Sequence, residues 1–222
     1  MSRFRKIFLT LGAVAVIACM SAKAQADTIT VTGVDSGQFS TATVVCEFNS
    51  QTNTFTFTIT NTSAITQPGS TSTITGIGFD LPPLGNASAS GLNGFTGMQA
   101  PSLSSMFTFS DADLGNVSHG FNDVVLDFGF ITGSNFLGGN TNLGLLPGES
   151  ASFTVSGAAF AGFTESEICN AIFVRFQNVP PEGRSGGSDV GVSSAVPEPS
   201  SMLLLGTALV GLGGYVRRRM KR

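Results

Sequence analysis

The sequence of 222 residues has no tryptophan, one tyrosine and one histidine. A single histidine, His119, leaves little room for a His-based metal site or a Ser-His-Asp triad, and its neighbours predict a surface loop. The shortage of tyrosine and tryptophan argues against the aromatic anchors that dominate many binding sites. The 19 phenylalanines suit a buried core instead. These absences favour a folded protein that is not an enzyme.

Basic residues are also scarce, but only in the middle of the chain. Residues 27–196 hold 13 acidic residues and two basic ones, Arg175 and Arg184, so this part has a net charge of −11. It contains no lysine, which excludes a lysine nucleophile. It also lacks the cations that neutralise phosphates, which excludes non-specific binding of nucleic acid. The remaining basic residues gather at the two ends, which therefore have different chemistry from the middle.

The first 26 residues have the three parts of a secretory signal peptide. A basic start is followed by an apolar run at 7–20, which is shorter than the ~20 residues of a membrane-spanning helix. Ala24 and Ala26 then form an A-x-A cleavage site before Asp27. The sequence therefore predicts export and a mature chain that begins at Asp27. The basic residues of the start are Arg3, Arg5 and Lys6.

A second interpretation of this segment stays open. Residues 16–19, Val-Ile-Ala-Cys, resemble the lipobox of bacterial lipoproteins. In that case Cys19 would be acylated and would anchor the chain through its lipid. The mass of the mature N-terminus separates the two interpretations, since one begins at Asp27 and the other at Cys19.

The last 26 residues combine a short motif, an apolar run and a basic cluster. Pro197, Glu198 and Pro199 come first, and residues 200–216 contain no charged side chain. A helix over this run and Pro199 rises about 27 Å, close to the ~30 Å hydrocarbon core of a bilayer. Because basic flanks stay in the cytoplasm, the acidic middle is expected outside the inner membrane. The basic cluster consists of Arg217, Arg218, Arg219, Lys221 and Arg222.

This tail resembles the PEP-CTERM sorting signal of Gram-negative bacteria, which has a Pro-Glu-Pro motif, a hydrophobic helix and a terminal arginine cluster in this order. The resemblance implies that an exosortase, a membrane transpeptidase, recognises residues 197–222 and cleaves near the motif. It implies a transient anchor in the inner membrane and then delivery to the cell surface or the extracellular space. Family members are typically surface or matrix proteins of organisms that make extracellular polysaccharide. An ordinary single-pass membrane anchor is the alternative.

The middle of the chain predicts one all-β domain over residues 27–179. Residues 54–60 place Phe and Ile on one face of a strand and threonine on the other. A hairpin joins this strand to residues 42–48 across a short loop. Residues 180–196, with many Pro, Gly and Ser, are expected to form a flexible linker. Further strands are expected at 28–34, 73–80, 106–109, 123–130, 151–157 and 171–178.

Two phrases within this domain, residues 57–63 and 146–155, are similar to strand phrases of bacterial immunoglobulin-like β-sandwiches. The resemblance implies a single β-sandwich in which Pro147 and Gly148 make a turn and the run after them enters the core. A jelly roll has the same local pattern, so both kinds of sandwich remain open.

Removal of the signal peptide leaves two cysteines, Cys46 and Cys169. An even number of cysteines in an exported chain indicates a disulfide. Cys46 lies on the apolar face of an expected strand, and Cys169 leads into another. We therefore predict one bond that closes nearly the whole domain, with two free buried thiols as the alternative.

Asp111, Asp113 and Asn116 are the one group of side chains that suggests a metal ion. Their oxygen atoms could bind a hard cation such as Ca²⁺, although the spacing is not that of an EF-hand and the group also fits a solvated turn. No other cofactor is expected.

The sequence thus predicts a structural or adhesive protein of the cell surface or of a biofilm matrix. Its expected partners are an exosortase and exopolysaccharide or other matrix components, and not nucleic acid. The alternative is a secreted module that binds glycan or ice through threonine-rich strand faces at residues 54–60 and 71–75.

Overall fold

The computed structural model describes residues 26–64, 71–82, 94–101, 105–111, 114–115, 117–180 and 187–194. Most of the expected signal peptide, including Ala24, and the whole sorting tail lie outside these residues. The predicted spanning helix at 200–216 lies outside them as well. The described strands are β1 Asp27–Gly33, β2 Gly37–Asn49, β3 Thr54–Asn61, β4 Thr73–Phe79, β5 Phe95–Gln99, β6 Thr108–Ser110, β7 Phe128–Ile131, β8 Ser150–Gly157, β9 Ile172–Val179 and β10 Gly187–Ser194. They are accompanied by two short helices, η1 Ala158–Phe160 and α2 Glu165–Asn170.

The strands follow the alternation in the sequence. Phe55, Phe57 and Ile59 of β3 are buried, and the threonines between them are half-buried on the other face. β2 and β3 pair in antiparallel register as the predicted hairpin. The turn between them brings Asn53 into a positive φ of 48°, a conformation that asparagine tolerates better than most residues. The all-β prediction is confirmed.

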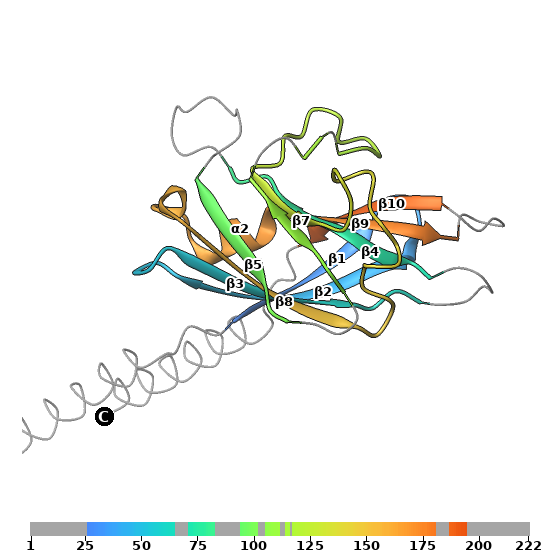
Figure 1. Cartoon of the computed structure of the whole chain (residues 1–222), viewed down its shortest axis with the longest axis horizontal. Helices are drawn as coiled ribbons and strands as arrows, with labels where there is room; N and C mark the ends of the chain where they lie inside the picture. The colour runs from blue at the N-terminus through green and yellow to red at the C-terminus, as the bar shows by residue number, and fades with distance from the viewer. Residues whose placement is uncertain are drawn as a thin grey trace, which may run out of the picture.

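All ten strands form one antiparallel sheet in the order β5-β8-β3-β2-β1-β10-β9-β4-β7-β6. The sheet bends over itself, so that its first five strands form one layer and its last five the other (Figure 1). β3 pairs with β8, and β4 pairs with β7. In the sequence, β5 and β6 lie between the two strands of each of these pairs. Sequence neighbours also pair, β1 with β2, β2 with β3 and β9 with β10, so that the single sheet closes almost into a barrel.

The two edge strands, β5 and β6, approach each other through the side chain of Gln99. Its Nε2 donates to the carbonyl oxygen of Ser105 at 3.2 Å and to Oγ of Ser105 at 2.9 Å, and its Oε1 accepts from the backbone N of Phe107 at 2.7 Å. β5 and β6 share no backbone hydrogen-bond ladder, and the amide side chain of Gln99 supplies some of the hydrogen bonds that such a ladder would make. Gly97 of β5 allows the close approach, because a Cβ there would lie 2.1 Å from the ring of Phe109.

The core between the layers is built mainly of phenylalanine. Phe57 of β3 stacks on Phe153 of β8 with ring centroids 5.0 Å apart. It also meets Phe79 of β4 at 5.2 Å and Phe130 of β7 at 6.0 Å, both edge to face. These contacts join the two layers, and such aromatic pairs contribute beyond the area that they bury.

The prediction of a flexible linker over residues 180–196 is wrong for residues 187–194, which form β10. Residues 187–194 lie near the middle of the sheet, between β1 and β9, so the folded domain extends to Ser194 and not to residue 179. The error has a physical cause. β10 carries a charged residue, Asp189, among small residues, a composition that normally indicates solvent exposure, yet Asp189 is fully buried. Its charge is satisfied by contacts far apart in sequence, which local composition cannot indicate.

Other differences are smaller. The sequence does not predict β5, because Phe95 is the one buried side chain of this strand and no apolar alternation is visible. β7 begins at Phe128, whereas the sequence predicts a strand from residue 123. The helix α2 has six residues, too few for visible periodicity, and a capping box between Thr164 and Glu167 fixes its first turn.

The structure contains the predicted disulfide. Cys46 of β2 bonds to Cys169 of α2, with their Cα atoms 6.2 Å apart and 123 residues between them in sequence. Both side chains are about 1% exposed. The bond therefore fixes α2 against the inner face of the first layer.

We predict that the double substitution Cys46→Ala and Cys169→Ala lowers the free energy of unfolding by about 2–5 kcal/mol, because it frees a long loop in the unfolded chain. Urea denaturation of the oxidised protein and the variant measures the difference. Adding reductant should lower the stability of the parent protein towards that of the variant. Two titratable thiols in the unreduced, unfolded parent would contradict the prediction.

Candidate functional site

The outer face of the first layer is covered by hydroxyl groups, and we call it the hydroxyl face. Inward positions of its strands are apolar, so the alternation leaves Thr and Ser outside, where they are half-buried or exposed. Val45, Met98 and Glu47 interrupt the pattern, and Glu47 is the one charged side chain among these outward positions. The hydroxyl face consists of Thr28, Thr30 and Thr32 of β1, Thr41 and Thr43 of β2, Thr54, Thr56, Thr58 and Thr60 of β3, Thr96 of β5, and Ser150, Ser152, Thr154 and Ser156 of β8.

Strand register aligns these side chains in rows across the sheet. One row runs through Thr30, Thr43, Thr60 and Ser150 on four neighbouring strands. Between β3 and β8 the hydroxyl groups pair directly. Two pairs are close, Thr58 with Ser152 and Thr60 with Ser150, both at 2.7 Å.

The other two pairs between β3 and β8 are longer. Thr54 lies 3.3 Å from Ser156, and Thr56 lies 3.5 Å from Thr154. Beside these looser pairs lies a shallow hollow of about 310 Å³, which is lined by Glu47, Asn49, Thr52, Thr54 and Thr56. Thr54 Oγ1 also donates to the carbonyl oxygen of Thr52 at 3.3 Å. This end of the hydroxyl face therefore combines long hydroxyl pairs with a concave shape.

The outer face of the second layer is different, because a long connection covers it. Described residues on either side of β7, between 114 and 127 and between 132 and 137 (yellow-green in Figure 1), contribute to a second apolar cluster that includes Leu114, Val117, Phe136 and Val190. Thr73 and Thr75 of β4 are fully buried. The expectation that residues 71–75 present a threonine-rich surface is therefore wrong.

Three titratable side chains meet at the edge of this covering segment. Asp35, His119 and Asp189 each offer one ligand atom, and these atoms lie within 4.8 Å of one another. His119 is paired with the carboxylate of Asp35, and its side chain is 18% exposed. The sequence placed His119 in a plain surface loop, and no local signal indicated a partner 84 residues away.

The hydrogen bonds of Asp189 give this cluster a structural role. Its Oδ1 accepts from the backbone N of Asp35 at 3.2 Å and of Val190 at 2.7 Å, and its Oδ2 accepts from N of Ser36 at 2.9 Å and from Oγ of Ser36. Four donors occupy the carboxylate, which leaves little capacity for a metal ion. Asp189 thus anchors the turn between β1 and β2 to β10.

Arg175 of β9 completes this region. The guanidinium is buried, and its Nη1 donates to Oγ of Ser118 at 2.9 Å. Burial lowers the pKa of Arg175, and the negative charge of Asp189 opposes this effect.

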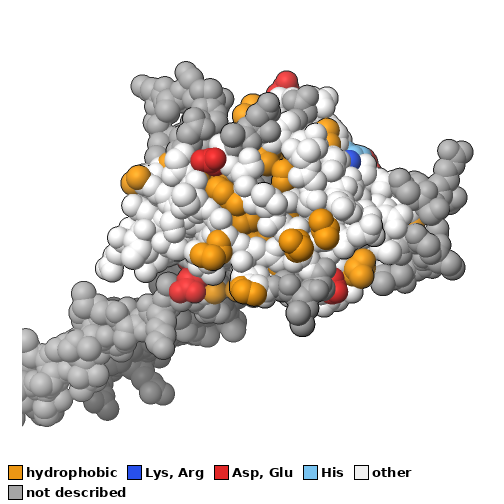
Figure 2. Space-filling view, viewed as in Figure 1, with side chains coloured by type: hydrophobic (Ala, Val, Ile, Leu, Met, Phe, Trp, Pro, Cys, Tyr) orange, Lys and Arg blue, Asp and Glu red, His pale blue; other side chains and the backbone are white. Residues whose placement is uncertain are grey.

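In Figure 2 the visible surface is mostly uncharged, with one small basic spot beside the histidine.

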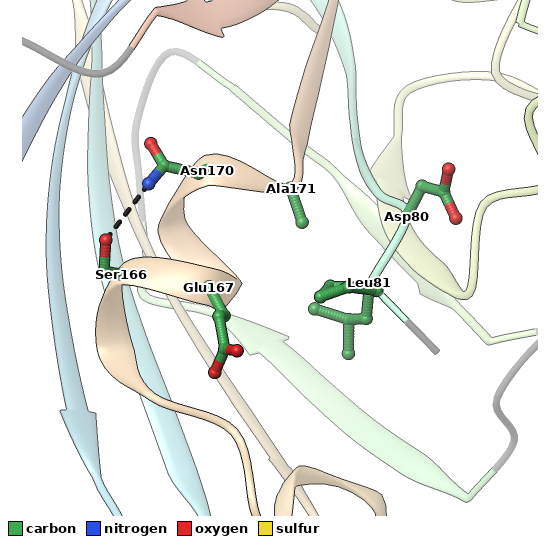
Figure 3. A pocket seen from close by; sticks show the side chains of 7 residues that line it. Asp80, Leu81, Ser166, Glu167, Asn170 and Ala171 are labelled. Carbon is green, nitrogen blue, oxygen red and sulfur yellow. Dashed lines mark hydrogen bonds between the residues drawn. The ribbon is translucent and has the colours of Figure 1, made fainter. Parts of the chain in front are cut away.

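A second hollow, of about 490 Å³, lies where β4 and α2 meet, and Asp80, Leu81, Pro82, Ser166, Glu167, Asn170 and Ala171 line it. The carboxylates of Asp80 and Glu167 point away from each other (Figure 3). Burial raises the pKa of Asp80, and the charge of Asp127 adds to the rise. Hydrogen bonds from Thr164 lower the pKa of Glu167. The two acids therefore do not face a common point, as paired-carboxylate chemistry requires.

The predicted Ca²⁺ site is only partly described. Asp111 is half-buried next to β6, whereas Asp113 and Asn116 lie outside the described residues. The site therefore stays a prediction.

Both ends of the folded domain lie at the same end of the sheet. β1 and β10 are antiparallel, and Thr30 is opposite Ser194, so the chain enters at Asp27 close to where it leaves. The expected signal and the tail therefore attach side by side. The PEP-CTERM protein-sorting motif matches residues 195–219, directly after β10.

The chain carries a PEP-CTERM sorting signal. The motif indicates an exported protein that is targeted to exosortase and processed at a membrane in Gram-negative bacteria. The match contains Pro197, Glu198, Pro199 and Arg217 to Arg219, whereas Lys221 and Arg222 lie beyond it. No curated protein and no solved structure matches the chain. Within the part that the structure describes, no helix has the length and apolar character to span a bilayer.

We predict that Asp80→Asn stabilises the protein near pH 7. The pKa of Asp80 is raised above its ordinary value of 3.8, so the folded state loses stability as the pH rises through the raised pKa. Asparagine removes this loss, and the Tm should increase by about 2 °C. The gain should vanish below pH 3.8, where the carboxyl is neutral in both states. Asp123→Asn, at an exposed position, is the control, and an equal pH-dependent gain there would contradict the explanation.

We also predict that signal-peptide cleavage creates an ion pair. Glu165 accepts from the backbone N of Asp27 at 3.3 Å and of Phe48 at 2.7 Å. Once Asp27 is the first residue, this nitrogen becomes a charged ammonium beside the Glu165 carboxylate. Glu165→Gln should then lose about 0.5–1 kcal/mol more stability in the processed chain than in a chain that retains Ala26. Equal losses in the two chains, measured by urea denaturation, would contradict the prediction.

Proposed function

We propose that this protein is delivered by exosortase processing to the cell surface or the extracellular polysaccharide matrix, where it has a structural or adhesive role and no catalytic one. The observation that carries this proposal is the sorting motif directly after the last strand of the folded domain. The tail directs the protein to its cellular location, and the folded domain remains after the tail has been removed.

The chemistry of the domain supports this role. A disulfide, a phenylalanine core and a nearly closed sheet suit a protein that works outside the cell. The net charge of −11 over residues 27–196 keeps copies of the domain soluble and apart. Contacts with a matrix then depend on uncharged surfaces or on bridging by divalent cations.

A second candidate is a secreted module that binds glycan or ice. The hydroxyl face favours it, because its aligned Thr and Ser side chains point outward over β1, β2, β3, β8 and β5, where they are half-buried or exposed. The two candidates share export and processing and differ in whether the domain recognises a specific ligand.

Deletion of residues 195–222 tests the proposed delivery. We expect the full chain at the cell surface or in the medium, and the truncated chain in the periplasm, since it lacks the membrane-held substrate for exosortase. Fractionation followed by detection with an antibody to the domain measures the difference. Glu198→Ala is the matched variant: it keeps the apolar run and the basic cluster, and should accumulate unprocessed in the inner membrane. Surface display that is unaffected by both changes would refute the proposal.

A further inference from the structure

The hydroxyl face extends over five neighbouring strands, and its outward groups keep some hydrogen-bonding capacity. A hydroxyl group has one donor and two acceptor sites, so a threonine paired with its neighbour across the strands retains hydrogen-bonding capacity. The hydroxyls of Thr54 and Thr56 have the longest pairs, at 3.3 and 3.5 Å. They also line the hollow beside Glu47 and Asn49, so hydroxyl, carboxylate and amide groups converge at one end of the face. Asn49 Oδ1 already accepts from the backbone N of Gln51 and Thr52, and Thr54 Oγ1 donates to the carbonyl oxygen of Thr52. The carboxylate of Glu47, the hydroxyl of Thr56 and the acceptor sites of Thr54 are therefore the groups that a ligand would meet.

The negative net charge of the domain favours a neutral ligand over an anionic or a cationic one. Residues 27–196 have a net charge of −11, which repels an anionic polymer. A cationic partner would be attracted to the acidic groups elsewhere, because the hydroxyl face has one charge, Glu47. A neutral chain of sugars meets no repulsion and offers the same donors and acceptors as the face itself. Glu47 can accept from sugar hydroxyl groups without requiring a charged partner.

The shape of the face favours a flexible polymer over a crystal lattice. Neighbouring strands lie ~4.8 Å apart, close to the length of one sugar unit, and residues i and i+2 lie ~6.7 Å apart. Successive strands are twisted by about 20°, so the rows are not flat over five strands. Three of the four rows that cross β8 have serine there in place of threonine, and Val45 and Met98 interrupt two of the rows. Ice requires a flat and regular array, whereas a sugar chain can follow a twisted surface.

We propose that the hydroxyl face binds a neutral polysaccharide, with one sugar unit seated in the hollow at Glu47, Asn49, Thr52, Thr54 and Thr56. This inference rests on the proposed function, since it names the matrix component that an exported copy would contact. Each contact is weak, and attachment comes from many hydroxyl groups along one polymer and many copies of the protein on it.

The test is co-sedimentation of the full-length chain with polysaccharide particles, in a polyoxyethylene detergent that contains no sugar. Three neutral polymers, a β-glucan, an α-glucan and a galactomannan, are compared with calcium pectate, which is anionic. We expect binding to at least one neutral polymer, unchanged in 0.5 M NaCl. The double variant Thr54→Val and Thr56→Val should bind about tenfold more weakly. It keeps side-chain shape and strand preference, and its fold is checked by circular dichroism and Tm.

Thr108→Val on β6 of the other layer is the control and should bind like the parent, because Thr108 is an exposed strand threonine outside the hydroxyl face. Three results would overturn the inference: binding to no neutral polymer, equal binding by the double variant and the parent, or retention by pectate alone. Enrichment in slowly grown ice without polymer binding would overturn it in favour of the ice alternative. None of these results affects the proposed delivery, which the deletion of residues 195–222 tests separately.

Discussion

The buried carboxylate of Asp189 is the interaction on which the arrangement of the domain depends. It sits on β10, the strand that joins the two layers, and holds the turn after β1 through N–H and O–H donors. A buried charge is tolerated only when it is well paired, and removing its partners costs several kcal/mol. Arg175 on the neighbouring strand supplies the opposite charge and, through Ser118, fixes the covering segment. One acidic side chain thus connects the sheet, a turn and a loop.

This arrangement gives the two outer faces of the sheet different chemistry. The covering segment packs apolar side chains on the second layer. The chain that follows it buries Thr73 and Thr75, because Thr132 donates to the carbonyl oxygen of Thr75, and Gly139 and Gly144 lie against the side chains of Thr75 and Thr73. No comparable segment among the described residues lies on the first layer, and its threonines remain at the surface. The same residue type therefore has two roles: threonine in β4 supports strand packing, and threonine in β3 forms a surface. Sequence alone cannot distinguish them, because the residues that cover the β4 threonines lie more than 50 positions after β4.

Features set by local pattern could be predicted from the sequence. Alternation in residues 54–60 gives β3 and its hairpin with β2, and cysteine number in an exported chain gives the Cys46–Cys169 pair. The sorting motif is likewise local. Features set by distant contacts could not be predicted. β10 is stable because Asp189 accepts hydrogen bonds from residues about 150 positions earlier. The full extent of the hydroxyl face depends on how five strands align with one another.

The position of β10 also constrains how the protein meets its processing enzyme. Pro197 follows Ser194 by three residues, and three extended residues span at most about 11 Å. The motif therefore cannot move far from the end of the sheet once the domain has folded, and an exosortase acting near Pro197 must approach that end closely. A cut before β10 would remove a strand that pairs on both sides. Cleavage after Ser194 leaves the whole sheet intact, so the fold itself limits where the tail can be removed without loss of the domain.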